Sequence, residues 1–172
     1  MAGVVVQRVR HEDGPELVTA NLASINLHEP FVYPFHDLVG FLAYLSRCDG
    51  ERSLGYVARD LAGGHVVGVI NINEIVRGVF QSAYLGYYGM AGMTGRGLMR
   101  EAVGLVIARA FSEHGLHRLE ANIQPENEPS RALARSLGFR QEGYSPRYLK
   151  IGGAWRDHER WAILSEDWQA PE

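Results

Sequence analysis

The sequence contains one cysteine and no long apolar run, and both shortages exclude classes of protein. The single cysteine, Cys48, excludes an internal disulfide and is typical of proteins from reducing compartments. No segment reaches the roughly 20 apolar residues that a membrane-spanning helix needs. The opening residues, MAGVVVQRVR, lack the basic region and long apolar stretch of a signal peptide. We therefore expect a cytoplasmic protein with no membrane partner.

The sequence also lacks an excess of basic charge. Its 17 Lys and Arg against 20 Asp and Glu give a net charge of -3, whereas nucleic-acid-binding domains usually carry a basic surplus or stripe. We expect no direct nucleic-acid partner. The seven histidines show no metal-ligand spacing such as H-E-x-x-H, and we expect no metal. With 172 residues, 46% of them hydrophobic, the chain is long enough for one domain, residues 1–172, with its own core.

The sequence alternates between strand-like and helix-like patterns. The predicted strands cover residues 4–10, 53–60, 65–72, 82–90 and 118–123, with a last hairpin in 140–164. The predicted helices cover residues 12–25, 36–48 and 98–114, with a short helix that Asn127 or Glu128 caps and Gly138 ends. The helix over 36–48 is expected to place Leu38, Phe41, Leu42 and Leu45 on one apolar face. This order predicts a mixed sheet with helices, of the α+β or α/β class.

The stretch GMTGRGLMREAV, residues 92–103, places three glycines and Arg96 directly before an amphipathic helix. It is not a Walker loop, because Leu98 and Met99 follow Gly97 where Lys and Ser or Thr should stand, and Arg100 replaces the third glycine of a Rossmann fingerprint. Glycines let backbone N–H groups turn toward an anion, and a helix N-terminus adds positive partial charge. The stretch therefore favours a pyrophosphate site, with a plain glycine turn as the alternative.

Two parts of the chain carry a resemblance to a known family. Strand 82–90, the loop after it and the next helix resemble the acetyl-CoA loop of the GCN5-related N-acetyltransferases (GNAT), usually Arg/Gln-x-x-Gly-x-Gly/Ala, with departures at Thr94 and Met99. NEPSRALARSLGFRQEGY and YLKIGGAWRDHERWAIL are similar to the RimJ/RimL-type ribosomal-protein-alanine N-acetyltransferases. The resemblance implies a mostly antiparallel seven-stranded sheet with about four helices, splayed between strands 82–90 and 118–123. It also implies acetyl-CoA as donor and a primary amine as acceptor.

The same resemblance implies which residues bind acetyl-CoA. Backbone N–H groups of five loop residues would hold the pyrophosphate: Gly95, Arg96, Gly97, Leu98 and Met99. Main-chain groups of Met90 would bind the pantetheine, and its N–H would polarise the thioester carbonyl. Asn127 would bond the pantetheine as well. Ser130 would protonate the departing thiolate, since the tyrosine of many relatives falls at Ala134; the alternative is that Asn127 and Ser130 only cap the helix.

The general base is left open by the sequence. An α-amine has a pKa of about 8, so a weak base acting through water is sufficient. The glutamate of the RimL branch falls at Leu149, whereas Tyr84 and Asn122 match positions that hold a water in some N-terminal acetyltransferases. Glu74 is the carboxylate to test beside them. Glu120 and Glu142 are further carboxylates, and for all three a surface ion pair is the competing interpretation.

The resemblance predicts a transferase that acetylates the N-terminal amine of a protein, with an N-terminal alanine of a ribosomal protein as the favoured acceptor. The amine would attack the thioester directly. One alternative is a small-molecule acceptor, an aminoacyl antibiotic or a polyamine, and another is a CoA-binding regulator without turnover. The sequence does not decide whether the chain forms a homodimer. Two segments are expected to border the acceptor entry: the loop at residues 28–35 and the hairpin residues Trp155 and Arg156. The alternatives are a packed aromatic loop, and a hairpin that is packed by the tryptophan and fixed by an Arg–Asp pair.

Overall fold

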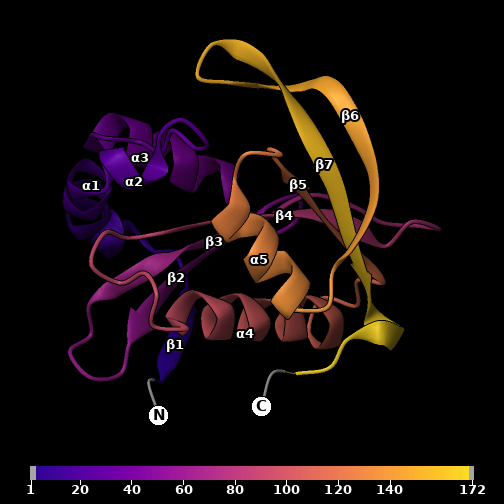
Figure 1. Cartoon of the computed structure of the whole chain (residues 1–172). Coiled ribbons are helices and arrows are strands. Elements are labelled where there is room, and N and C mark those ends of the chain that lie inside the picture. Colours follow the sequence, from indigo (N-terminus) through magenta and orange to yellow (C-terminus); the bar gives the residue numbers. More distant parts are fainter. Residues whose placement is uncertain (1–2, 171–172) are drawn as a thin grey trace.

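Residues 3–170, which the computed structural model describes, build one seven-stranded sheet with helices on both faces (Figure 1). The strands are β1 (Val4–Arg8), β2 (Leu54–Asp60), β3 (Val66–Val76), β4 (Ser82–Gly89), β5 (Arg118–Ile123), β6 (Arg140–Ile151) and β7 (Ala154–Leu164). The helices are α1 (Gly14–Ala23), α2 (Ile25–His28), α3 (Leu38–Arg47), α4 (Leu98–Ser112) and α5 (Glu128–Ser136), with 3-10 turns η1 (His11–Asp13) and η2 (Ser165–Asp167). None of the helices in this part of the chain is long and apolar enough to cross a membrane.

The strands lie in the order β1-β2-β3-β4-β5-β7-β6, and only β4 and β5 run parallel. This arrangement confirms the predicted mixed, mostly antiparallel sheet. The parallel pair joins only Ser82–Tyr84 to Arg118–Glu120, although β4 continues to Gly89 and β5 to Ile123. The sheet therefore opens beyond Tyr84 and Glu120, between the two strands where the splay is predicted.

Two apolar clusters hold the helices, one on each face of the sheet. The larger cluster packs α4 against the strands, because its apolar residues recur at helical spacing and form one stripe: Leu98, Ala102, Val103, Val106, Ile107 and Ala110. The smaller cluster joins Leu17 of α1 and Phe41 of α3 to Val57, Val69 and Met90. Figure 1 shows α1, α2 and α3 gathered at the other side of the molecule from α4 and α5.

The N-terminal helices differ from the sequence prediction in two ways. The predicted helix over 12–25 ends at Ala23, and a separate short helix, α2, runs from Ile25 to His28 and so ends at the first residue of the loop at 28–35. In α3 only Phe41 of the predicted apolar face is buried, while Leu38 is 52% and Leu42 46% exposed. The closest approach of α3 to α1 is made by Phe41, since a Cβ on Gly14 would lie 2.6 Å from its ring, and Tyr44 and Leu45 pack against the same cluster while staying partly exposed.

The hairpin of β6 and β7 projects beyond the other strands (Figure 1). Three residues of β6, Pro146 to Tyr148, stand opposite Asp157 in a bulge. Asp157 holds this bulge, since its Oδ1 accepts from the Arg147 N–H at 2.7 Å and its Oδ2 from the Tyr144 hydroxyl. The turn at Gly152 lies against Tyr33, so a Cβ on Gly152 would be 2.6 Å from the Tyr33 ring. The hairpin and the loop after α2 therefore meet in space.

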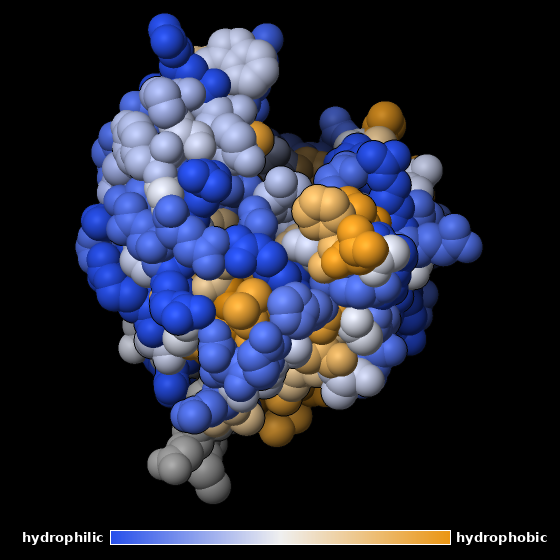
Figure 2. Space-filling model, turned by 90° about the vertical axis from the view of Figure 1, so that its right-hand side faces the viewer, coloured by the Kyte–Doolittle hydropathy of each residue, from blue (hydrophilic) through white to orange (hydrophobic). Residues whose placement is uncertain are grey.

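The face toward which the β3–β4 turn projects is mostly hydrophilic. Figure 2 shows it with small, separate apolar patches among polar side chains. Val79 and Phe80 of that turn are 99% and 67% exposed. Trp155, at the start of β7, is also exposed at 61%, so the alternative of a hairpin packed by this tryptophan is wrong. The Arg–Asp pair of that alternative is absent as well, since Asp157 bonds Tyr144 and Arg147 instead.

Candidate active site

The opening between β4 and β5 leaves backbone groups of β4 without a strand partner. The Met90 N–H donates to the Val67 carbonyl of β3 at 2.9 Å. Since bonded and non-bonded pairs alternate along an antiparallel ladder, Tyr88 and Gly86 also face β3. Leu85, Tyr87 and Gly89 then face β5, beyond the point where β5 separates. Their main-chain groups border the opening.

The predicted role of the Met90 N–H is therefore wrong. Its N–H is already donated to Val67, and its carbonyl accepts from the Met93 N–H at 3.1 Å. An N–H has one proton to donate, so Met90 cannot polarise a ligand carbonyl. The alternation places the N–H groups of Leu85 and Tyr87 at the opening instead. The carbonyl of Gly89 is taken by His28, whose Nε2 lies 2.7 Å away.

The glycine loop has the open backbone that an anion needs. Gly92, Gly95 and Gly97 have φ values of 80°, 73° and 75°, and a Cβ built on any of them would meet nothing within 4 Å. Gly97 is the N-cap of α4, and no side chain caps this end. The next three N–H groups, from Leu98 to Arg100, have no hydrogen-bond partner among residues 3–170. Uncapped N–H groups at a helix start, beside the cationic Arg96, suit a pyrophosphate.

Two further glycines seat α4 against the sheet. The Met99 side chain lies across Gly68 of β3 and Gly89 of β4, so that a Cβ on Gly89 would be 3.3 Å from Met99 Cγ and one on Gly68 would overlap the Met99 sulfur. This close approach fixes the N-terminus of α4 at the end of β4. The loop therefore lies beside the end of β4, the strand that borders the opening.

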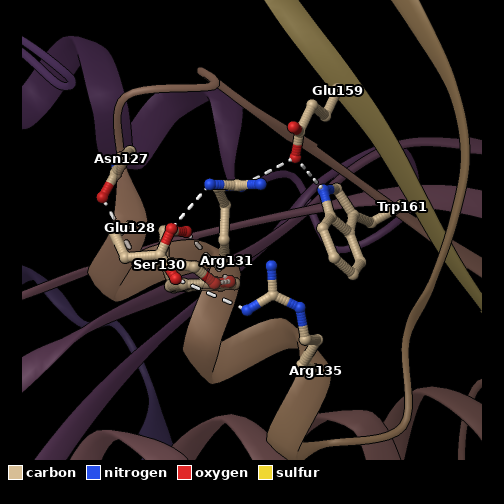
Figure 3. Close-up of polar contacts among 8 residues, drawn as sticks. Asn127, Glu128, Ser130, Arg131, Arg135, Glu159 and Trp161 are labelled. Atoms are coloured by element: carbon tan, nitrogen blue, oxygen red, sulfur yellow. Dashed lines mark hydrogen bonds and ion pairs between the residues drawn. The ribbon is translucent and has the colours of Figure 1, made fainter.

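Helix α5 is fixed at one side of the opening by a polar network (Figure 3). Asn127 Oδ1 accepts from the Ser130 N–H at 3.3 Å, so Asn127 rather than Glu128 caps the helix. Arg131 Nε donates to Glu159 Oε2 at 3.0 Å, and Trp161 Nε1 donates to the same oxygen at 3.0 Å. These bonds tie α5 to β7.

Ser130 meets a tyrosine that the sequence analysis did not select. Ser130 Oγ donates to Tyr87 Oη at 3.1 Å, and Tyr87 Oη donates to the Ser130 carbonyl at 3.2 Å. Burial raises the pKa of Tyr87 to about 12, although the hydrogen bond to Ser130 acts in the opposite direction. Strand alternation in SAYLGYYG would have put Tyr87 on the face of the buried Ala83 and Leu85. The contact with Ser130, 43 residues away, required the fold.

Tyr84 and Asn122 lie on the opposite face of the sheet from Tyr87, because side chains alternate along a strand. Burial and a hydrogen bond to Tyr148 raise the pKa of Tyr84. Asn122 Oδ1 is buried and has no hydrogen-bond partner among residues 3–170. Buried amide oxygens in proteins usually accept a hydrogen bond, so this oxygen is suited to accept one from a water or a ligand donor. Both residues adjoin the opening, as their predicted role requires.

The structure does not bring Glu74 into this group. Its side chain is 55% exposed, and its carboxylate pairs with Arg52 at 2.6 Å, which is the surface ion pair weighed against a catalytic role. Glu120 and Glu142 both pair with Arg118, so the ion-pair interpretation holds for them as well. The prediction that Glu74 is the carboxylate base is wrong on these grounds.

A cavity lies beside the glycine loop. The cavity measures about 500 Å³, lies between α1 and the ends of β3 and β4, and borders Ser24, His65, Met90 and Met93. It adjoins the glycine loop and reaches neither Ser130 nor Asn122. Within residues 3–170, no group of three or more His, Cys, Asp or Glu side chains is placed to hold a metal ion.

Comparison with known proteins identifies the same arrangement elsewhere. The family model described as an acetyltransferase (GNAT) domain matches residues 4–140. The chain is 42% identical over 103 residues to the ribosomal protein uS5-alanine N-acetyltransferase of Escherichia coli, a stretch that covers 60% of this chain and 53% of that relative. Mycobacterium smegmatis RimJ in complex with CoA-disulfide is 33% identical, with a TM-score of 0.86 over 95% of this chain and 82% of that chain. Vibrio cholerae spermidine N-acetyltransferase in complex with CoA and spermine shares the fold, with a TM-score of 0.81 at 19% identity over 95% of this chain and 96% of that chain.

Proposed function

The chain belongs to the GNAT acetyltransferases and uses acetyl-CoA, and from this premise we propose that it acetylates the N-terminal α-amine of a protein. The observation that carries the proposal is its 42% identity to a ribosomal protein uS5-alanine N-acetyltransferase. That match spans about half of the relative's length, so the acceptor is argued from the site as well. An N-terminal alanine of a ribosomal protein is the acceptor we propose.

The binding path for acetyl-CoA follows from the open backbone groups. The pyrophosphate is held by the loop from Gly95 to Met99 with Arg96 beside it, since these N–H groups lack partners in the described structure. The pantetheine lies along β4, where the main-chain groups of Leu85 and Tyr87 face the opening. Asn127 uses its Oδ1 as the cap of α5, so only its amide NH₂ is available to the pantetheine.

The reaction needs little help with the amine proton. An α-amine with a pKa of about 8 is already partly neutral at pH 7.5, so it attacks the thioester carbonyl directly once it is positioned. A nitrogen–carbon bond forms and the carbon–sulfur bond breaks, without an acyl-enzyme. Asn122 Oδ1 and Tyr84 hold a water that accepts the amine proton, which gives the buried, unpaired oxygen a partner. The Ser130 hydroxyl donates to the departing thiolate from the other face.

The charges around the opening favour a peptide over a polyamine. A polyamine carries several ammonium groups, which are bound by unpaired carboxylates. Here Glu120 and Glu142 are neutralised by Arg118, and Glu159 by Arg131. The contact between Gly152 and Tyr33 brings the β6–β7 hairpin and the loop after α2 together, which supports the proposal that these two segments border the acceptor entry. Such a border suits one extended chain end.

A competition experiment tests the acceptor class. The protein is incubated with acetyl-CoA and equal concentrations of an Ala-starting ribosomal-protein peptide and spermidine, and the products are identified by mass spectrometry. We expect one acetyl group on the peptide α-amine. Acetylated spermidine with unmodified peptide would overturn the proposal in favour of a small amine. Glu74→Gln is the matched variant, which should retain the wild-type rate because this exposed carboxylate is engaged in an ion pair with Arg52.

A further inference from the structure

The hydroxyl of Ser130 has one partner within residues 3–170, and that partner is a second hydroxyl. Tyr87 lies three positions beyond Tyr84, the last β4 residue that pairs with β5, so it stands where the sheet has opened. Its side chain points to the α5 face, where its oxygen lies 3.1 Å from Ser130 Oγ. The strand register and the hydrogen bond together place Tyr87 and Ser130 at the opening.

The two contacts between Tyr87 and Ser130 determine how the hydroxyl protons are arranged. A carbonyl only accepts, so the 3.2 Å contact to the Ser130 carbonyl uses the Tyr87 proton. The Ser130 proton then points to Tyr87 Oη. Rotation about two C–O bonds reverses this order without moving a heavy atom: Tyr87 donates to Ser130 Oγ, and Ser130 donates into the opening. Each hydroxyl keeps a partner in both arrangements.

We propose that Tyr87 is a positioning residue, which orients and polarises the Ser130 hydroxyl toward the thiolate that leaves during acetyl transfer. The inference rests on the proposed function and adds a residue to its chemistry. When the nitrogen–carbon bond forms, the electron pair of the carbon–sulfur bond stays on sulfur. Ser130 donates a hydrogen bond to that charge, and the bond from Tyr87 strengthens Ser130 as a donor because linked hydrogen bonds polarise one another.

Tyr87 supplies a hydrogen bond and keeps its proton. A thiol has a pKa of about 8.5, whereas the pKa of Tyr87 is raised to about 12 by burial. Net proton transfer from this phenol to the thiolate is therefore unfavourable by more than about a thousandfold. The thiolate takes its final proton from solvent, which receives one from the amine, so protons balance over the reaction.

Other hydrogen bonds already hold α5 in place. Helix α5 is capped by Asn127 and tied to β7 through Arg131 and Glu159. The contact between Tyr87 and Ser130 is therefore not required to anchor the helix.

The decisive experiment titrates the thiol of bound CoA and needs no acceptor. Thiolate absorbance is followed against pH for CoA bound to the wild type, Tyr87→Phe, Ser130→Ala and Tyr56→Phe. The last variant is the control, since it also removes a buried tyrosine hydroxyl, one bonded to His114 at 2.9 Å. We expect the bound thiol to titrate about one pH unit higher in Tyr87→Phe and Ser130→Ala than in the wild type and the control. Equal titration in all four proteins would overturn the inference.

Kinetics supply the second readout. Tyr87→Phe should lower kcat roughly tenfold with little change in the KM for acetyl-CoA. Its effect should largely disappear in a Ser130→Ala background, because Tyr87 acts through Ser130. Additive losses would overturn the inference, as would a rise in KM alone. A shifted thiol titration without peptide turnover would refute the proposed acceptor and leave the role of Tyr87 standing.

Discussion

Arg131→Met should destabilise the protein much more than Glu159→Gln, although each removes one side of the same ion pair. The Glu159 side chain is 9% exposed and depends on Arg131 and Trp161 for its hydrogen bonds. Without Arg131, a buried carboxylate keeps only the neutral Trp161 donor. Loss of one partner of a buried pair costs about 3–5 kcal/mol, and the partial exposure of Arg131, 24%, lowers this to about 2–3 kcal/mol.

The opposite replacement leaves no buried charge. Glu159→Gln retains an oxygen for Trp161 Nε1, and Arg131 still pairs with Glu128 at 2.6 Å, whose side chain is 61% exposed. A cost of about 1 kcal/mol follows from the weaker hydrogen bonds.

Thermal unfolding measures this asymmetry. For a chain of this length, 1 kcal/mol corresponds to roughly 2–4 °C, so Tm should fall by about 5–10 °C in Arg131→Met and by about 2–4 °C in Glu159→Gln. The double variant Arg131→Met/Glu159→Leu should recover most of the loss, since an apolar pair replaces a buried ionic one at little cost. Arg135→Met is the control: its guanidinium lies 5.4 Å from the Trp161 ring and should contribute less than about 1 kcal/mol. Equal losses in the two single variants would refute the reasoning.

Three further predictions concern the loop, the opening and the ion pairs. Gly97→Ala should lower the free energy of unfolding by about 1 kcal/mol, because Gly97 has a φ of 75°, and it should raise the KM for acetyl-CoA in steady-state kinetics. Gly78→Ala is the control, since Gly78 has a φ of 69° in the β3–β4 turn, and it should cause the same strain with an unchanged KM. Equal KM values in both variants would contradict acetyl-CoA binding by the glycine loop. Asn122→Leu should leave Tm unchanged or raised, because it removes a buried oxygen without a partner, while kcat falls about tenfold; wild-type turnover would exclude the water-holding role. Arg118 lowers the pKa of Glu142 from its usual 4.5, so this pair adds stability above pH 4.5 and loses it as pH falls through the lowered value. The Tm difference between the wild type and Arg118→Met should therefore shrink below that pH, and a constant difference would contradict the assignment.

Local patterns in the sequence were sufficient for most of the elements. The stripe from Leu98 to Ala110 predicts α4, and Asn127, Pro129 and Gly138 predict both ends of α5. The glycines before α4 predict an open loop, and the structure gives them positive φ values. These signals involve neighbours along the chain, which is why they are readable without the fold.

Features that depend on contacts distant in sequence were not readable. Leu38 and Leu42 continue an apolar face, but they are exposed because α3 turns Phe41 toward Gly14 of α1 and leaves these two side chains at the surface. The direction of the Met90 N–H depends on the register with Val67. Tyr87 is hydrogen-bonded to Ser130 of α5, 43 residues later in the chain. The Glu74 carboxylate forms an ion pair with Arg52, 22 residues earlier.

The central claim is tested most directly by CoA release from acetyl-CoA with an Ala-starting ribosomal-protein peptide, beside the same peptide with a blocked α-amine. The proposal predicts release with the free peptide only, because the attacking group is the N-terminal nitrogen. Release that is equal with both peptides would contradict N-terminal acetylation. Tight acetyl-CoA binding without release from either would contradict this acceptor for the chain.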